Sequence, residues 1–357
     1  MNHRTVDFGT ADFARRLIRW QRRHGRNDLP WQATRDPYLV WLSEVMLQQT
    51  QVATVIPYFE RFRARFSDIA ALASADEDEV LALWSGLGYY SRARNLHRAA
   101  RMIVEEHGSV FPSQREIIET LPGIGRSTAA AIAAFAFGAR EAILDGNVKR
   151  VLARHFAVSG WPGTPAVERK LWQIAEALLP SRSIEIYTQA VMDLGATVCT
   201  TRAPACDRCP VRAACEAHAR DDVERFPAAR PRRALPRKST TMLVLVHQGE
   251  VLLEKRPPTG VWGALWCFPE IESGRVAKRV AINRYGCKLA DTKALAPLAH
   301  SFTHFSLTIE PLLARATSRN GLAAEAGCIW LPLEDASAAA VPTPVRRILQ
   351  SLEISAR

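Results

Sequence analysis

Glu44 is the first residue in this chain whose surroundings suit it to acid catalysis. It lies within the stretch Leu39–Gln49, where its neighbours at helical spacing are apolar or amide side chains. Burial among such neighbours disfavours the charged carboxylate and raises its pKa, which a general acid working near neutral pH requires. A glutamate at a helix edge that faces water is the alternative interpretation. Position 44 is therefore a candidate proton donor.

Asp145 is a second carboxylate with a possible chemical role. It precedes Gly146 and Asn147, and a helical apolar pattern follows them. An aspartate at this position can cap the new helix by accepting from its free N–H groups. An ionised carboxylate at a helix start can also stabilise positive charge that develops on a sugar ring. The two roles are compatible, and both remain open.

A glycine-containing turn lies upstream of Asp145, within residues 121–128. Pro122 ends one helical pattern, the two glycines permit a tight turn, and the next helix is expected over Thr128 to Phe137. The unpaired N–H groups at the start of that helix could hold a phosphate oxygen. An ordinary connection between two helices is the alternative.

Four of the seven cysteines have the spacing Cys-x6-Cys-x2-Cys-x5-Cys. They are Cys199, Cys206, Cys209 and Cys215. Thiolates so close in sequence can converge on one metal centre, either an iron–sulfur cluster or a structural zinc ion. Disulfides are a third possibility, but they are rare in intracellular proteins, whose thiols are kept reduced. The spacing predicts a metal centre without choosing between iron and zinc.

Composition limits the possible classes of protein. The 357 residues are 48% hydrophobic and carry a formal net charge of +11, which favours several globular domains and a polyanionic partner such as nucleic acid. The N-terminal stretch lacks the apolar core of a signal peptide, and the apolar run at 129–139 is too short to span a bilayer. We expect a soluble intracellular protein.

The hydrophobic periodicity changes along the chain. From Asp12 to about Arg225 the apolar residues recur at helical spacing, and a basic, proline-containing linker follows to Lys238. Beyond it, Met242–Val246 and Glu250–Glu254 predict a hairpin. Alternating residues at 305–310 predict a further strand, and a closing helix is expected from Thr343. The chain is predicted to be multidomain, with an all-α part followed by an α+β part.

The glycine turn, the downstream aspartate and the cysteine motif together resemble the endonuclease III superfamily of helix-hairpin-helix DNA glycosylases. The cysteine loop of that superfamily holds a 4Fe-4S cluster, so the resemblance, rather than the spacing, favours iron over zinc. Its bifunctional glycosylase/lyases carry a Schiff-base lysine two residues after the second hairpin glycine. This chain has Ser127 there and offers no amine at that position.

Four further stretches resemble the adenine DNA glycosylase family of MutY type, and the match covers nearly the whole chain. They are Leu29–Gln32, Ser43–Val52, Gly86–Tyr90 and Asp145–Val148. The resemblance implies a monofunctional base excision repair enzyme that hydrolyses the glycosidic bond of adenine mispaired with 8-oxoguanine or guanine in duplex DNA. It also implies a monomeric bacterial protein of the cytoplasm, associated with the nucleoid through DNA and not with a membrane.

The resemblance assigns roles to individual residues. Glu44 would protonate the departing adenine, Asp145 would stabilise the sugar cation or its adduct, and Asn147 would assist. The adenine pocket and the wedge that enters the DNA would comprise Trp31, Gln32, Gln49, Leu87, Tyr89, Ser127 and Gln189. The phosphate hairpin would use Leu121, Gly123, Gly125 and Thr128, and the four motif cysteines would hold one 4Fe-4S cluster.

The C-terminal part resembles the Nudix-like domain with which this family reads 8-oxoguanine. The family's recognition loop contains Phe-Ser-His, and this chain has Phe302, Thr303 and His304. Threonine keeps the hydroxyl, while its extra methyl leaves affinity and discrimination open. The helical stretch Val276–Tyr285 lacks the acidic cluster that holds magnesium in a Nudix hydrolase, so we expect no pyrophosphatase activity.

The expected organisation has four parts. Residues 1–28 and 138–225 would form the iron–sulfur domain, 29–137 a six-helix domain, 226–240 a basic linker and 241–357 the Nudix-like domain. Two other functions remain as alternatives: a glycosylase/lyase for oxidised pyrimidines and a non-catalytic damage-binding protein. Ser127 argues against the first, and the pair Glu44 and Asp145 argues against the second.

Overall fold

The computed structural model describes residues 10–231, 235–320 and 327–356. It divides into two compact units: residues 1–73 with 98–232, here called the helical unit, and residues 74–97 with 233–357, here called the sheet unit. The first nine residues of the segment expected at 1–28, and residues 232–234 of the expected linker, lie outside the described residues.

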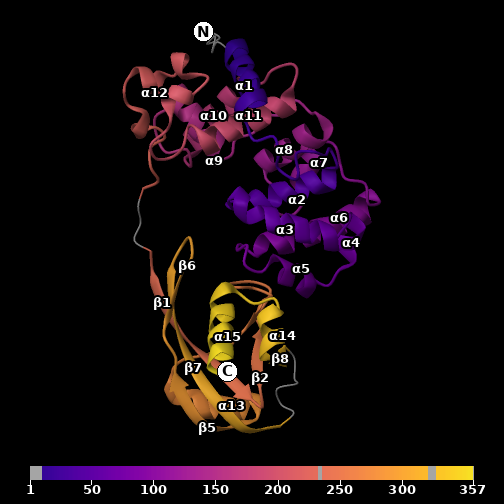
Figure 1. Ribbon diagram of the computed structural model, residues 1–357, viewed down its shortest axis with the longest axis vertical. Helices are drawn as coiled ribbons and strands as arrows, with labels where there is room; N and C mark the ends of the chain where they lie inside the picture. The colour runs from indigo at the N-terminus through magenta and orange to yellow at the C-terminus, as the bar shows by residue number, and fades with distance from the viewer. Residues whose placement is uncertain (1–9, 232–234, 321–326, 357) are drawn as a thin grey trace. The chain divides into compact units, whose positions relative to one another are not determined.

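The helical unit consists of α-helices joined by short turns, as the periodicity predicted (Figure 1). Its longer helices are α1 (Thr10–His24), α2 (Pro37–Leu47), α3 (Val52–Arg65), the later part of α6 (Ser91–His107), α8 (Arg126–Phe137), α9 (Gly146–His155), α10 (Pro165–Ala177) and α11 (Ile184–Thr197). Its shorter elements are α4 (Ile69–Ser74), α7 (Arg115–Thr120), α12 (Glu216–Ala219) and the 3-10 turns η1 (Cys206–Arg208), η2 (Arg212–Ala214) and η3 (Val223–Arg225).

Helix α2 lies in the interior of the helical unit. Asp36 caps its N-terminus by accepting from the Tyr38 N–H at 2.9 Å, and Pro37 occupies the first turn, where no N–H is needed. The side chains of Trp41 and Met46 are fully buried, and α2 packs against α3 and α8. A helix that is apolar on most sides belongs in a core, so its one carboxylate, Glu44, is held in a largely dehydrated setting.

Helices α8 and α9 position the second carboxylate. α8 begins at Arg126, earlier than the expected Thr128, because Gly125 already serves as its N-cap. Small buried alanines at 129–131 and 133–134 let α8 approach α2 and α7 closely. After a short connection, α9 begins at Gly146, and it packs against α10, α11 and α12.

The sheet unit contains a mixed sheet with the strand order β3-β2-β1-β7-β5. The strands are β1 (Arg237–His247), β2 (Glu250–Lys255), β3 (Trp266–Cys267), β4 (Glu270–Ile271), β5 (Cys287–Ala294), β6 (Leu298–Ser301), β7 (Ser306–Arg319) and β8 (Cys328–Pro332). β1 pairs in parallel with β7 and antiparallel with β2. The unit's helical elements are α5 (Glu77–Trp84), η4 (Gly274–Val276), α13 (Ala277–Tyr285), α14 (Leu333–Ala338) and α15 (Thr343–Ala356).

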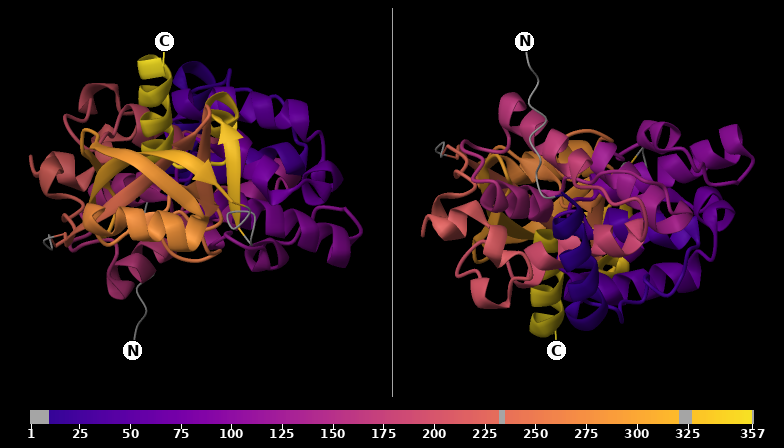
Figure 2. Two further views of the ribbon diagram at one scale, coloured as in Figure 1. Left: turned by 90° about the horizontal axis from the view of Figure 1, so that it is seen from below. Right: turned by 90° about the horizontal axis from the view of Figure 1, so that it is seen from above.

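Helices cover both faces of this sheet. Residues 242–245 of β1 are all buried, as expected for a strand with packing on both sides, and Figure 2 shows α13 and α15 on opposite faces. The predicted hairpin, the alternation at 305–310 and the closing helix from Thr343 are confirmed. β1 starts at Arg237, so its first residues lie within the stretch expected to be linker.

Candidate active site

Glu44 and Asp145 line one cavity of the helical unit. This catalytic cavity has a volume of about 860 Å³, and its wall includes residues of α2 and of the turn after it, together with residues of α8, α9 and α11. A second, smaller cavity of about 340 Å³ shares Trp31, Glu44 and Gln189 with the first. Two carboxylates that lie 101 positions apart in sequence therefore face the same space, with Glu44 at the wall between the two cavities.

The environment of Glu44 favours its protonated form. Burial is the main cause and the negative charge of Asp145 the second, and together they raise the pKa of Glu44 from 4.5 to about 8. Such a carboxyl group holds a proton at neutral pH and can still release it to a base. This is the condition that the sequence predicted for a general acid.

Asp145 caps α9 and has partners that suit an anion. Its Oδ1 accepts from the Val148 N–H at 2.7 Å, and its Oδ2 accepts from Asn147 Nδ2 at 3.2 Å. Burial raises the pKa of Asp145, whereas these two hydrogen bonds and the positive charge of Arg150 act in the opposite direction. In this pair of carboxyl groups, the hydrogen bonds to Asp145 place the negative charge there and the proton on Glu44.

Ser127 supports the backbone that leads to Asp145. Its Oγ accepts from the Leu144 N–H at 2.9 Å, directly before the carboxylate in sequence. Ser127 also lines the catalytic cavity. The residue that stands in the position of the lyase lysine therefore has a structural hydrogen bond here.

Arg150 and Arg154 connect α9 to the cysteine-containing loop. Arg150 donates to Asn147 Oδ1 at 2.8 Å and to the carbonyl of Cys199 at 2.7 Å. Arg154 is buried and donates to the carbonyls of Thr200 and Phe226, at 2.6 and 2.9 Å. Its Nη1 also lies 3.4 Å from the Cys199 sulfur. One helix thus carries the cap carboxylate at its start and holds the cysteine loop with its later turns.

Asp193 organises the wall below Gln189. The carboxylate is fully buried and accepts from Gln189 Nε2, Gln21 Nε2 and the Arg26 guanidinium at 2.8 to 2.9 Å, with the Arg26 backbone N–H as a further donor. An ion-paired carboxylate only accepts, so Gln189 must turn its amide nitrogen toward it. The amide oxygen of Gln189 remains as the acceptor that this side chain can offer.

The turn expected to bind phosphate has an open backbone. Leu121 is buried and anchors the turn, and Gly123 has a φ of +80°, which glycine adopts without strain. A Cβ added at Gly125 would meet nothing within 4 Å, so the backbone there is accessible to a ligand. Gln48 donates to Thr128 Oγ1 at 3.4 Å and to the Gly123 carbonyl at 3.5 Å, tying the turn to α2.

Two of the residues expected to enter DNA have strained backbones. Gln49 and Tyr89 both have positive φ, 57° and 49°, although neither is a glycine. Tyr89 is 46% exposed, unusually open for an aromatic ring, and Gln49 is also exposed. Strain and exposure of this kind are typical of functional residues. Leu87, in contrast, is buried, so its side chain supports the turn and is not presented to solvent.

Trp31 and Gln32 lie where an aromatic and an amide could face a base. Trp31 is buried, contacts the Phe59 ring edge-on with centroids 5.4 Å apart, and lines both cavities. Gln32 lines the smaller cavity, and its Oε1 accepts from the Leu29 N–H at 3.2 Å.

The four motif cysteines are free thiols in one loop region. Burial is the main cause that raises the pKa of Cys206, Cys209 and Cys215, and the charge of Cys199 adds to each shift, so the four thiols act on one another electrostatically. Within residues 10–231, 235–320 and 327–356, no three His, Cys, Asp or Glu side chains are placed to hold a metal ion. The mutual electrostatic influence of the four thiols shows that they are neighbours in this loop.

The expected recognition loop lies in the sheet unit beside a cavity of about 580 Å³. Phe302 stacks on Phe305 with centroids 4.5 Å apart, while Thr303 and His304 are exposed, with Thr303 Oγ1 3.4 Å from His304 Nδ1. Tyr89 lines the same cavity, within the same unit.

The sequence did not indicate Arg26, Asp193 or Arg150 as parts of the site. Gln189 and Asp193 are one helical turn apart, which is the signal that could have suggested their pairing. Arg26 and Arg150 gave no such signal, because their partners are distant residues or backbone carbonyls.

Comparison with known proteins places the chain in a family. The family model of the HhH-GPD superfamily base excision DNA repair proteins matches residues 42–177, and that of the NUDIX domain matches residues 240–351. Among solved structures, a thermostable thymine-DNA glycosylase shares 27% identity and a TM-score of 0.54, covering 59% of this chain and 97% of its own. An endonuclease III–DNA complex, at 18% identity and a TM-score of 0.51, covers 60% and 98% and shows a likeness of fold.

Relatives of known name match over most of their length. The adenine DNA glycosylase of Buchnera aphidicola from Acyrthosiphon pisum is 36% identical over 346 residues, which are 96% of this chain and 97% of that protein. The human adenine DNA glycosylase is 35% identical, with 94% of this chain and 72% of that protein covered. Together with the shared cavity of Glu44 and Asp145, these matches show that the chain belongs to the adenine DNA glycosylase family of base excision repair enzymes, which hydrolyse N-glycosyl bonds.

Proposed function

We propose that the substrate is adenine mispaired with 8-oxoguanine or guanine in duplex DNA, and that Glu44 and Asp145 act together on it. The observation that carries the proposal is the single cavity lined by a protonated Glu44 and a hydrogen-bonded Asp145. The names of the relatives supply adenine as the base. An adenine inside the stack cannot reach a cavity within the protein, so the nucleotide must first be extruded, which costs less at a mispair.

In the proposed reaction, Glu44 donates its proton to N7 of adenine as the glycosidic bond breaks. Protonation converts adenine into a good leaving group, and a positioned acid contributes roughly 10² to 10⁴ in rate. Asp145 stabilises the positive charge that develops on the sugar. Water then adds to the sugar, and the proton that the water loses restores the acid form of Glu44, which completes the hydrolysis. Asn147 holds Asp145 through the 3.2 Å hydrogen bond.

Gln189 is proposed to read the exocyclic amine of adenine. Because Asp193 engages its amide nitrogen, its oxygen is available to accept from an amino group. Trp31 offers an aromatic face, and Gln32 a second amide. Gln49 and Tyr89 are proposed as the residues that enter the helix, and the turn at 121–128 as the phosphate site. Phe302, Thr303 and His304 are proposed to contact the 8-oxoguanine.

Cys199, Cys206, Cys209 and Cys215 are proposed to hold a 4Fe-4S cluster. A zinc ion needs its four thiolates about 2.3 Å from one point, whereas a cluster takes one thiolate for each of several irons. The four thiols shift one another's pKa values, which supports their being neighbours. Membership of the adenine DNA glycosylase family, with its likeness to endonuclease III-type glycosylases, supports the cluster over a zinc ion. The bound cluster would supply a covalent tie across the loop that Arg154 also holds.

Purified protein on defined duplexes tests the proposal. Duplexes with A:8-oxoguanine, A:G, A:T or an oxidised pyrimidine are incubated with and without later alkali. We expect adenine release from the first two and strand breaks only after alkali, since no amine occupies position 127. Nicking of oxidised pyrimidines without alkali would instead favour a lyase, and mispair binding without release would favour a damage-binding protein.

A further inference from the structure

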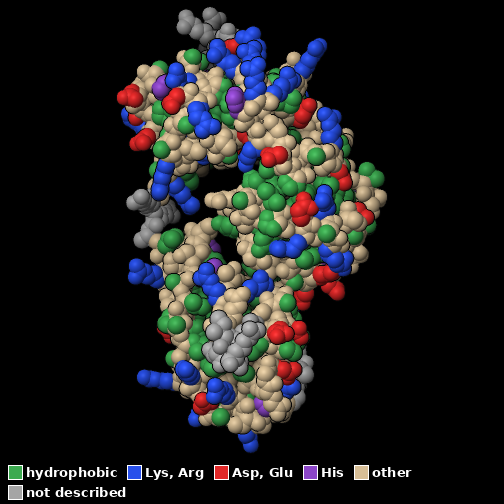
Figure 3. All heavy atoms as spheres, viewed as in Figure 1, with side chains coloured by type: hydrophobic (Ala, Val, Ile, Leu, Met, Phe, Trp, Pro, Cys, Tyr) green, Lys and Arg blue, Asp and Glu red, His purple; other side chains and the backbone are tan. Residues whose placement is uncertain are grey.

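A hollow on the helical unit is surrounded by arginines that the catalytic site does not use. It has a volume of about 700 Å³ and lies between α1 and the segment Leu179–Ser183 that precedes α11. Its lining includes Arg15, Arg19, Arg22 and Arg23 from α1 and Arg182 from the facing segment, and no acidic side chain. We call this feature the arginine hollow. Figure 3 shows Lys and Arg side chains gathered over α1.

Most of these guanidinium groups carry uncompensated charge. Among the described residues, Arg19, Arg22, Arg23 and Arg182 are exposed and make no ion pair, whereas Arg15 pairs with Asp12. The nearest acid of α11, Glu185, lies 3.7 Å from Arg35. Four uncompensated guanidinium groups around one concave surface repel one another, and a polyanion that binds there relieves this repulsion.

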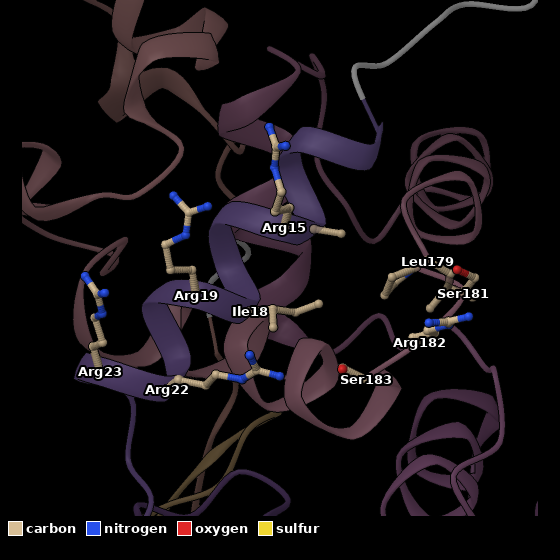
Figure 4. A pocket seen from close by; sticks show the side chains of 11 residues that line it. Arg15, Ile18, Arg19, Arg22, Arg23, Leu179, Ser181, Arg182 and Ser183 are labelled. Carbon is tan, nitrogen blue, oxygen red and sulfur yellow. The ribbon is translucent and has the colours of Figure 1, made fainter.

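The arrangement along α1 suits a row of phosphates. Arg15, Arg19 and Arg23 follow one another at intervals of four residues, so they share a helix face and lie roughly 6 Å apart along the axis. Figure 4 shows these three side chains on one side of α1, while Arg22 extends toward the segment that carries Arg182. A row about 12 Å long corresponds to three or four phosphates of one B-DNA strand. Guanidinium forks bind phosphate oxygens in pairs.

The arginine hollow is also connected to the catalytic site. Arg22 lines both the hollow and the smaller cavity that contains Glu44, Trp31 and Gln189. The hollow and the smaller cavity therefore adjoin at Arg22. This proximity to the catalytic site favours the substrate's own polymer over an unrelated acidic protein.

We propose that the arginine hollow binds the sugar–phosphate backbone of undamaged duplex DNA. The contacts are to phosphates and carry no sequence information, so they raise affinity for any duplex equally. Such a surface keeps the enzyme near DNA between lesions and is independent of how the base is recognised. It is an interaction that the catalytic cavity does not provide.

The test measures binding of an undamaged 30-base-pair duplex to the full chain at several KCl concentrations by fluorescence anisotropy. The variant Arg19→Gln with Arg23→Gln and Arg182→Gln is compared with Arg61→Gln, Arg63→Gln and Arg65→Gln, which remove the same charge from exposed positions of α3. We expect the first triple variant alone to bind roughly tenfold more weakly at low salt. Its log–log salt slope should be shallower by about 0.9 for each phosphate that the variant no longer neutralises.

Equal weakening in the two triple variants would overturn the proposal, because net charge alone would then explain the binding. A wild-type salt slope in the first variant would also overturn it. So would a first variant that binds the duplex as the wild type does but no longer binds a polyglutamate peptide, because the hollow would then serve an acidic protein. The binding assay does not depend on adenine release. A wild-type enzyme that binds the duplex but releases no adenine would therefore refute the proposed function. The salt slopes of duplex binding would still decide the present proposal.

Discussion

At the scale of single residues, the site depends on hydrogen bonds that fix charged groups in a dehydrated cavity. Burial on α2 raises the pKa of Glu44, so that it holds its proton near neutral pH, whereas the donors of α9 oppose the rise that burial causes in the pKa of Asp145. Neither property belongs to the side chain alone. Each follows from the neighbours that the fold supplies, so changes in those neighbours are expected to alter the chemistry.

Ser127→Ala tests the support beneath Asp145. The variant leaves the partly buried Leu144 N–H without its acceptor, which costs roughly 1–3 kcal/mol in the free energy of unfolding. We expect a lower urea midpoint and slower adenine release, because the turn before Asp145 loses a fixed point. Ser127→Thr keeps the oxygen and serves as the control. Equal behaviour of the two variants would contradict a supporting role for the hydroxyl.

Asp193→Asn tests the buried ion pair below Gln189. Arg26 then lacks its counter-charge in a largely buried position, and we expect a loss of about 3–5 kcal/mol in the free energy of unfolding. Glu185→Gln removes a carboxylate from the exposed pair with Arg35 and should change stability by less than about 1 kcal/mol. Denaturant titrations measure both. Similar small losses in the two variants would show that Asp193 has no special structural role.

At the scale of elements, α9 has two structural roles: it positions Asp145 and it holds the cysteine-containing loop. Its N-cap is the catalytic candidate Asp145, and its later turns hold the loop that contains the cysteines through Arg150 and Arg154. A helix of ten residues is stiff enough to keep these two ends in a fixed relation. A substitution that weakens the contacts between α9 and the cysteine-containing loop is therefore expected to loosen the loop more than it displaces Asp145.

Arg154→Met tests how the loop is held. The buried guanidinium donates to backbone carbonyls at Thr200 and Phe226, and methionine cannot replace these donors. We expect amide hydrogen exchange to speed up across residues 199–226 while α11 keeps its protection. Arg208→Gln, an exposed change in the same loop, should leave exchange unchanged. Exchange that rises evenly over the whole helical unit would contradict a local role.

At the scale of the whole molecule, a helical unit with a catalytic cavity is joined in one chain to a sheet unit of Nudix type. We expect the Nudix resemblance to concern the fold and not the hydrolase chemistry. Helix α13, where such chemistry would need carboxylates for magnesium, contains Lys278, Arg279 and Arg284 and no acidic residue. The sheet unit therefore retains a scaffold whose loops can serve recognition.

The full chain is expected to lack magnesium-dependent pyrophosphatase activity on nucleoside triphosphates, including 8-oxo-dGTP. Without carboxylates on α13, the metal that would neutralise the phosphates has no ligands there. Release of pyrophosphate is followed over a range of Mg²⁺ concentrations, with a functional Nudix hydrolase as the positive control. Turnover that depends on Mg²⁺ would show that the sheet unit holds a metal elsewhere.

Local signals in the sequence predicted much of this architecture. The helical spacing up to Arg225, the hairpin after Met242 and the capping position of Asp145 each depend on neighbours close in sequence, and the structure confirms them. The predicted start of α8 was wrong by part of a turn, because the N-cap residue is Gly125, which has no side chain to signal the cap.

None of the helices in the described residues is long and apolar enough to cross a bilayer.

Site residues that belong to short sequence motifs could be predicted. Site residues that are brought together only by contacts between distant parts of the chain could not. Glu44 and Asp145 could be chosen from their own neighbours, whereas their common cavity depends on the packing of α2 against α8 and of α11 against both α8 and α9. Arg26 and Asp193 come from the segment after α1 and from α11, and only folding brings them together. The roles of the pocket and wedge residues, and the four-part domain division, stay predictions.

The most direct test of the account is the pH dependence of adenine release from an A:8-oxoguanine duplex, measured in single turnover from pH 5 to 10. Glu44 acts in its protonated form and has a pKa of about 8, so the rate should be steady near neutral pH and fall about tenfold for each pH unit above 8. Glu44→Gln should lower the rate at pH 7 by roughly 10² to 10⁴ and remove this alkaline decline. A rate that stays constant up to pH 10, or a Glu44→Gln variant with wild-type rate and pH profile, would contradict the assignment of Glu44 as the proton donor.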